Sequence, residues 1–174
     1  AARVSAIMKD LREFSTVRND KRQTEVDLNR VIEKSVAICR GKLAKMVDVL
    51  DVRRSPQKLS ITTDPGQLEQ VLINLMSNAV KFTNEGGTIR FTSRRSDTML
   101  HLSITDTGVG IPENKIQELF NLNDVQSTAG TSGESGTGLG LIVCFEFMSI
   151  NKGSIDVEST PGEGSTFTLN LPLN

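Results

Sequence analysis

The chain has 174 residues, which is enough for one domain with a substantial core and one additional helix. Hydrophobic residues make up 37% of it and charged residues 24%, a composition that excludes an intrinsically disordered protein. The formal net charge is only -1, so no basic field favours nucleic acid or an anionic membrane, and we expect neither as a partner.

The cysteines and the hydropathy pattern predict a cytoplasmic protein. Cys39 and Cys144 match no metal-binding or redox spacing, so we expect reduced, buried thiols in a reducing compartment. No apolar run reaches the ~20 residues that span a membrane, and no signal peptide opens the sequence. Any membrane anchor of a parent protein is therefore expected outside these residues.

The first residues predict a helix with one narrow apolar stripe. The stripe consists of Val4, Ile7, Met8, Leu11 and Phe14. Two interpretations remain open: the stripe is a seam for a helix outside this sequence, or the helix packs on its own domain. The polar stretch 18–24 is predicted to be a linker.

Hydrophobic periodicity and turn residues predict the elements of the remaining chain. The predicted helices are 29–44, 64–82, 112–120 and 139–150, and the predicted strands are 47–52, 58–62, 88–95, 99–105, 153–159 and 165–171. The residues expected to face inward from the first of these helices are Val31, Ile32, Ser35, Ile38, Cys39 and Leu43. The helix 139–150 is apolar nearly all round and is expected to be buried. The long polar stretch 121–136 is predicted to be a functional loop.

This order of helices and antiparallel hairpins favours an α+β fold. We expect a two-layer α/β sandwich, in which helices cover one face of a mixed, largely antiparallel sheet.

The helix that begins after Asp64 has a strong start signal and an unusual polar stripe. Asp64 is the expected N-cap, and Pro65 occupies the first helical position. The stripe consists of Gln70, Asn74, Asn78 and Lys81, which fall within a narrow arc of the helix. An asparagine carbonyl can bind Mg²⁺, and a lysine can contact a phosphate oxygen. Because polar helix faces are usually just solvated, the stripe alone also fits a plain surface.

Three glycine-rich motifs follow this helix. The first, Asp106-Thr107-Gly108-Val109-Gly110-Ile111-Pro112, lets the backbone approach a ligand and offers a carboxylate to an exocyclic amine. The second, Gly136-Thr137-Gly138-Leu139-Gly140-Leu141, opens a helix, and helix N-termini bind anions. The third is Gly162-Glu163-Gly164-Ser165-Thr166-Phe167. Taken alone, the motifs are also compatible with a tight turn, a hinge and a hairpin.

The combination is more specific than any single motif. Asn74-Leu75-x-x-Asn78-Ala79-x-Lys81-Phe82, followed by the three glycine motifs in this order, resembles the ATP-binding domain of sensor histidine kinases. The wider superfamily includes DNA-gyrase-type, heat-shock chaperone and mismatch-repair ATPases. The resemblance covers residues 24–174 and implies the sandwich fold with a flexible ATP lid, which looks like that of a bacterial subgroup. Residues 1–23 then resemble the end of an upstream dimerisation and phosphoacceptor hairpin with its linker.

The resemblance implies a role for each matching residue. Asn78 is the expected Mg²⁺ ligand, Lys81 is expected to contact a phosphate oxygen, and Asn74 to line the phosphate side of the pocket. Asp106 is expected to read the adenine amino group, with Thr166 assisting it through a water molecule. The other expected nucleotide-binding residues are Gly108, Gly110, Phe120, Gly136, Thr137, Gly138, Leu139 and Gly140.

The implied reaction transfers the γ-phosphoryl group of Mg-ATP to a histidine on a separate dimerisation hairpin. The implied partners are this hairpin, a response-regulator receiver domain and a second copy of the parent protein in a homodimer. The only histidine of the sequence, His101, lies in a predicted strand and does not match the phosphoacceptor pattern. The chain is therefore not expected to phosphorylate itself.

Departures from the family pattern leave two alternatives open. Leu122-Asn123 replace an aromatic residue that usually follows Phe120, and the loop 121–136 contains no Lys or Arg for the γ-phosphate. A nucleotide-sensing module without transfer activity is therefore one alternative. The other is a hydrolytic ATPase of the same superfamily, but Asn74 stands where those relatives place a glutamate, and an amide cannot act as general base.

Overall fold

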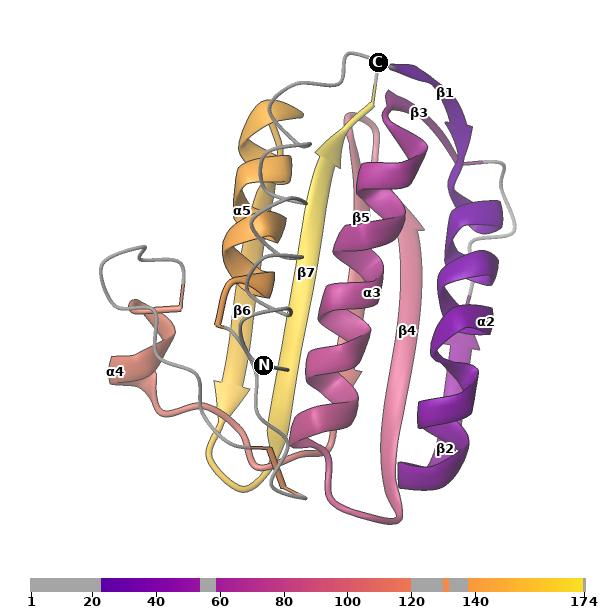
Figure 1. The fold of residues 1–174 in the computed structure, drawn as a ribbon. Coiled ribbons are helices and arrows are strands. Elements are labelled where there is room, and N and C mark those ends of the chain that lie inside the picture. The colour runs from indigo at the N-terminus through magenta and orange to yellow at the C-terminus, as the bar shows by residue number, and fades with distance from the viewer. Residues whose placement is uncertain (1–22, 54–58, 120–129, 132–137, 174) are drawn as a thin grey trace, which may run out of the picture.

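The computed structural model describes residues 23–53, 59–119, 130–131 and 138–173 (Figure 1). The helix expected over residues 1–20 and most of the loop 121–136 lie outside the described residues. The elements are β1 (Thr24–Asp27), α2 (Leu28–Met46), β2 (Val47–Arg53), β3 (Ser60–Thr63), α3 (Pro65–Phe82), β4 (Gly87–Arg95), β5 (Met99–Asp106), α4 (Glu113–Ile116), α5 (Gly140–Ile150), β6 (Ser154–Thr160) and β7 (Gly164–Pro172).

The five-stranded sheet has the order β2-β4-β5-β7-β6. β2 pairs with β4 in parallel, and all other neighbours in this sheet are antiparallel. Helices α2, α3 and α5 lie side by side over one face, and a small antiparallel pair of β1 and β3 stands at the end of α2 (Figure 1). The expected two-layer sandwich with a mixed, largely antiparallel sheet is confirmed.

The core lies between the sheet and the three helices. Along β5, Leu100, Leu102 and Ile104 are buried and alternate with partly exposed residues, as expected for a strand with one covered face. The central helix α3 buries seven residues against this layer and its neighbours: Leu68, Val71, Leu72, Leu75, Met76, Ala79 and Val80. Because α3 lies in the middle of the helical layer, its packing determines where the chain segments before and after it begin and end.

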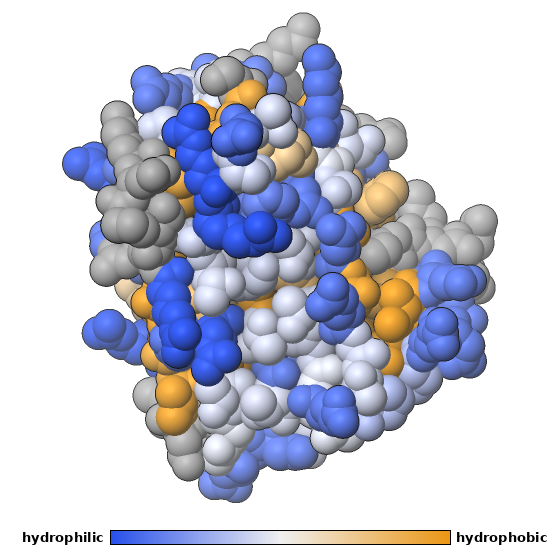
Figure 2. Space-filling model, turned by 180° about the vertical axis from the view of Figure 1, so that it is seen from behind, coloured by the Kyte–Doolittle hydropathy of each residue, from blue (hydrophilic) through white to orange (hydrophobic). Residues whose placement is uncertain are grey.

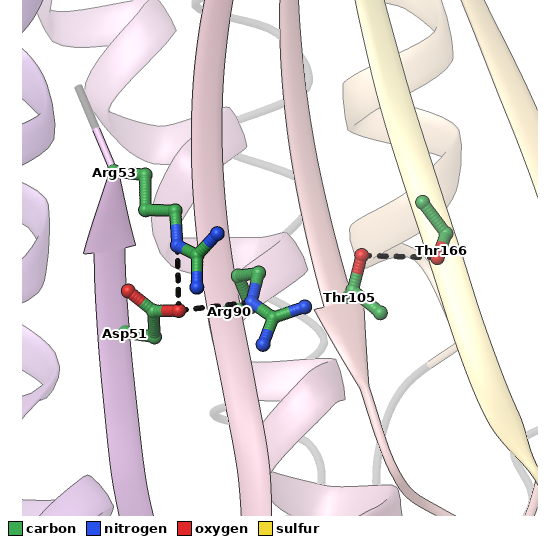
Figure 3. Close-up of polar contacts among 5 residues, drawn as sticks. All are labelled: Asp51, Arg53, Arg90, Thr105 and Thr166. Carbon is green, nitrogen blue, oxygen red and sulfur yellow. Dashed lines mark hydrogen bonds and ion pairs between the residues drawn. The ribbon is translucent and has the colours of Figure 1, made fainter.

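The opposite face of the sheet is open and hydrophilic (Figure 2). On its β2–β4 side, Asp51 accepts hydrogen bonds of 2.9 Å from both Arg53 and Arg90 (Figure 3). The hydrogen bond from Arg90, with a further contribution from Arg53, lowers the pKa of Asp51 below its usual value. Because all three side chains are solvated, this ion pair contributes little to stability.

Several sequence expectations differ from the structure. Thr24, the expected end of the linker, lies in the strand Thr24–Asp27, because these residues pair with β3. Ile38 was expected to face inward but is 54% exposed, since α2 lies at the margin of the helical layer and buries the side that faces α3. Phe145 is 48% exposed, so α5 is not buried all round. The helix expected over 112–120 is limited to Glu113–Ile116.

No described helix is both long enough and apolar enough to cross a membrane.

The start of α3 provides a stability test. The Asp64 side chain accepts a hydrogen bond of 2.9 Å from the Gln67 backbone N–H, which confirms the expected N-cap. Asp64→Ala removes this bond and should lower the free energy of unfolding by about 1 kcal/mol, measured by urea denaturation. Asp97→Ala, at an exposed position between β4 and β5, is the matched control and should change it little. Equal losses in the two variants would contradict the capping role.

Candidate functional site

The candidate site lies at the end of the molecule where α3 ends and α5 begins (Figure 1). The end of β5 and the turn between β6 and β7 reach the same end of the fold. The polar stripe of α3 is half-buried and extends toward this region. The first motif contacts the end of α3 and the second contacts α3 at Asn74, whereas the third contacts the first.

Asn74 connects α3 with the first turn of α5. Its Oδ1 accepts a hydrogen bond of 3.1 Å from Gln70 Nε2, and its Nδ2 donates to the Gly140 carbonyl oxygen at 3.3 Å. A Cβ on Gly140 would lie 3.7 Å from the Asn74 side chain, an ordinary van der Waals contact. Asn74 is thus a structural link between two helices, and its expected place on the phosphate side stays a prediction.

Asn78 and Lys81 lie farther along the same stripe. Within the described part of the chain, the half-buried amide of Asn78 makes no hydrogen bond, so it is available to a ligand. The Lys81 ammonium lies 4.8 Å from the centroid of the Phe82 ring, a cation–π distance, near the C-terminal end of α3. Such an amide oxygen would hold a magnesium ion, and the ammonium one turn later would contact a phosphate oxygen.

The described residues contain no group of three or more His, Cys, Asp or Glu side chains that could hold a metal ion. A divalent cation takes several oxygen ligands, so one held at Asn78 would need further oxygens beyond this single amide.

Asp106 is a buried carboxylate at the end of β5, with only 5% of the residue exposed. Its Oδ1 accepts a hydrogen bond of 2.9 Å from the Gly108 backbone N–H, and the Ser165 backbone also donates to the carboxylate. Burial raises the pKa of Asp106 above its usual value, although these two hydrogen bonds oppose the increase. A buried acceptor of this kind can recognise an amine by hydrogen bonding.

The loop after β5 is fixed to its neighbours through glycine. A Cβ on Gly108 would overlap the Phe82 carbonyl group, and one on Gly110, where φ is 69°, would overlap the Thr160 carbonyl group. The Val109 backbone N–H donates to Phe82 O at 3.0 Å, and its carbonyl accepts from the Gly162 N–H at 2.8 Å. Both positions therefore require glycine, because one chain segment packs closely on another there.

Thr166 was expected beside Asp106, and this placement is wrong. Thr105 and Thr166 form a hydroxyl pair 3.0 Å apart on the open face of the sheet (Figure 3). Asp106 follows Thr105 along β5, so it points to the opposite, helix-covered face. The partner of Asp106 in the β5–β7 register is Ser165, which is 7% exposed.

Ser165 and Ser159 are site residues that the sequence analysis did not identify. The two hydroxyl oxygens are 2.9 Å apart, and Ser159 Oγ also accepts from the Ile111 backbone N–H at 2.7 Å. They tie the loop after β5 to the β6–β7 hairpin, in which Ser165 is the strand partner of Asp106. The available signal was strand alternation, because Ser165 lies two residues before the buried Phe167 and therefore shares its face.

The second glycine motif is described only from Gly138 onward. Gly138 has a φ of 79°, and Leu139 precedes the first helical residue, Gly140. No side chain in the described residues caps the N-terminus of α5, so its backbone N–H groups remain candidates for an anion. The expected binding residues Phe120, Gly136 and Thr137 lie outside the described residues.

Both cysteines are free and buried, as expected. Burial raises the pKa of the Cys144 thiol to about 12, so the group stays protonated. Its Sγ contacts Val71 O at 3.7 Å, which places it in the packing between α3 and α5. The thiol therefore has a structural role beneath the site.

Comparison with known proteins identifies this arrangement. Residues 63–174 match the family described as histidine kinase-, DNA gyrase B-, and HSP90-like ATPase. The circadian input-output histidine kinase CikA of Synechococcus elongatus is 33% identical over 171 residues, which are 95% of this chain and 23% of that protein. The sensor histidine kinase RcsC of Salmonella typhimurium is 42% identical over 115 residues, 66% of this chain and 12% of that protein.

Solved structures agree with these relatives. The nucleotide-free catalytic domain of the histidine kinase ThkA is 30% identical, with a TM-score of 0.75, 87% of this chain covered and 97% of that chain. A ThkA structure in complex with the response regulator TrrA is 25% identical, with a TM-score of 0.77, 98% of this chain covered and 48% of that chain. The chain spans less than a quarter of the length of CikA or RcsC and corresponds to the ATP-binding part of such kinases. It belongs to the histidine kinase-, DNA gyrase B-, and HSP90-like ATPase family.

Proposed function

We propose that this domain binds Mg-ATP and transfers its γ-phosphoryl group to a histidine on a separate dimerisation hairpin of a two-component sensor histidine kinase. The observation that supports this most is the convergence of Asn78, Lys81 and the buried Asp106 at one end of α3. The chain belongs to an ATPase family, which supports ATP as the nucleotide that binds to these residues.

The adenine end of the site is formed by Asp106. An ionised carboxylate is an acceptor only, so it complements the exocyclic amino group of adenine. The backbone N–H groups of Gly108 and Ser165 hold the carboxylate in a fixed orientation. With Thr166 on the other face of the sheet, Ser165 is our proposed assistant to Asp106 at the base.

The phosphate end is formed by neutral and positive groups. Asn78 is the proposed Mg²⁺ ligand, Lys81 the proposed contact to a phosphate oxygen, and Asn74 and the N-terminus of α5 complete this side. A bound Mg²⁺ supplies charge neutralisation between phosphate groups. The protein residues then hold the triphosphate in position while the bond between the γ-phosphorus and the ADP oxygen breaks and a phosphorus–nitrogen bond forms to the acceptor histidine.

The acceptor must come from outside the described residues. His101 lies on the open face of the sheet, with its Nδ1 2.6 Å from Asn170 Oδ1, whereas Asp106 lies on the covered face. We therefore propose the histidine-bearing hairpin of a parent homodimer as the substrate and a response-regulator receiver as the next partner. The complex of ThkA with TrrA supports the latter by analogy.

Loss of the Asn78 amide tests the metal assignment. Asn78→Ala should weaken Mg-ATP binding about tenfold while binding in EDTA changes little, because the variant removes one magnesium ligand. Titration with a fluorescent ATP analogue, with and without magnesium, measures both. Asn84→Ala, an exposed amide just beyond α3, should bind like the unchanged protein. A loss that is equal with and without magnesium would contradict the ligand role.

Replacement of Asp106 tests the adenine assignment. Asp106→Asn should lower affinity for the analogue at least tenfold at neutral pH, because a hydrogen bond to a charged acceptor is lost. In the unchanged protein, affinity should fall on acidification through the Asp106 pKa, which lies above the ordinary 3.8. Unchanged binding by the variant would exclude Asp106 from the base site.

The same carboxylate gives a stability test without any nucleotide. A raised pKa means that the folded state favours the protonated acid, so its favourable contribution is present at low pH and is lost as pH rises through the folded-state pKa. Relative to Asp106→Asn, the unchanged protein should therefore gain stability as pH falls from 7 toward 4. Parallel thermal melts measure this, and a constant difference between the two curves would contradict it.

Transfer itself requires a supplied acceptor. The domain, mixed with a separately purified histidine-bearing hairpin and γ-labelled ATP, should move label to the hairpin and not to itself. ATP binding without any labelled hairpin would favour the alternative of a nucleotide-sensing module. Release of free phosphate without a labelled hairpin would favour the hydrolytic alternative.

A further inference from the structure

The C-terminal end of α3 presents successive backbone carbonyls that other segments of the chain use. The last carbonyls of an α-helix have no donor within the helix. Phe82 O accepts from the Val109 N–H at 3.0 Å, and Lys81 O accepts from the Thr131 N–H at 3.0 Å. The Thr131 hydroxyl lies 3.2 Å from Lys81 O and 3.1 Å from Thr83 O, so it can donate to either.

Thr83 makes this end of the helix rigid. Its residue is fully buried, and both its backbone N–H and its hydroxyl donate to Ala79 O, at 3.0 and 2.6 Å. The Thr83 carbonyl is therefore held in a fixed place for the Thr131 hydroxyl. The helix end thus offers Thr131 a preformed pair of acceptors.

The two sets of hydrogen bonds serve different halves of the site. Val109 belongs to the loop that contains Asp106 and Gly108, so its bond to Phe82 O fixes the adenine side. Thr131 belongs to the connection between α4 and α5, and its contacts adjoin Lys81, the proposed phosphate contact. A residue that anchors only the connection between α4 and α5 should therefore affect phosphate binding and leave adenine recognition unchanged.

We propose that Thr131 is a positioning residue for the phosphate side of the nucleotide site. It fastens residues 130–131 to the backbone of Lys81 and Thr83, so that these two residues are held beside Lys81 before nucleotide binds. Ordering a segment in advance lowers the entropy that binding must remove, which raises affinity without a direct contact. The inference rests on the proposed function, because it needs the Lys81 side to be where phosphates bind.

The test uses the whole 174-residue chain and compares ligands with and without phosphates. Thr131→Val keeps the shape and the backbone N–H but removes the hydroxyl, so it should weaken ATP and ADP binding about fivefold and leave adenosine binding unchanged. Thr131→Ser should restore the affinities of the unchanged protein. Thr62→Val, at an exposed position on β3, is the matched control and should alter none of them.

Calorimetric titration with ATP, ADP and adenosine measures these affinities. If Thr131→Val bound ATP as tightly as the unchanged protein, the positioning role of Thr131 would be overturned and the proposed function would stand. The same holds if Thr131→Val lost as much affinity for adenosine as for ATP, because such a loss indicates a general structural defect. If the unchanged protein bound no ATP, the proposed function would fall and the inference with it. Normal ATP binding without transfer to the hairpin would overturn only the transfer half of the proposed function.

Discussion

The fold depends on the packing of α3 between the sheet and its two neighbouring helices. Its apolar side is buried against the core, and this fixes which side of the helix faces the candidate site. The carbonyl groups at its C-terminal end cannot be satisfied within the helix, so hydrogen bonds from Val109 and Thr131 take them up. The same requirement that ends the helix therefore also brings the two loops of the site together.

The alternation of side chains along the sheet separates two environments. On the covered face, Asp106 and Ser165 are buried beside the end of α3. One residue away on each strand, Thr105 and Thr166 pair on the open hydrophilic face (Figures 2 and 3). Because side chains alternate with period two, a displacement of one residue moves a side chain from the site to the far surface.

That period explains what the sequence could and could not predict. The position of α3, its Asp64 cap, the hairpins and the sandwich were predictable, because apolar spacing and capping residues act locally. The placement of Thr166 beside Asp106 failed because the motif indicated the hairpin but not the face of the sheet on which each residue lies. The exposure of Ile38 depended on which helix packs beside α2, and the strand Thr24–Asp27 depended on pairing with β3. Both are long-range contacts with no local signal.

The distribution of charge within the site follows the chemistry of its proposed ligand. Among the described residues the acidic group of the site is Asp106, and it lies at the proposed base end, where an uncharged amine would be the partner. The proposed phosphate end has amides and an ammonium instead. A second buried carboxylate there would repel a triphosphate and would bind magnesium without nucleotide, whereas one amide ligand holds the ion weakly by itself. Under the proposed function, a neutral ligand at Asn78 would thus make metal and nucleotide binding depend on each other.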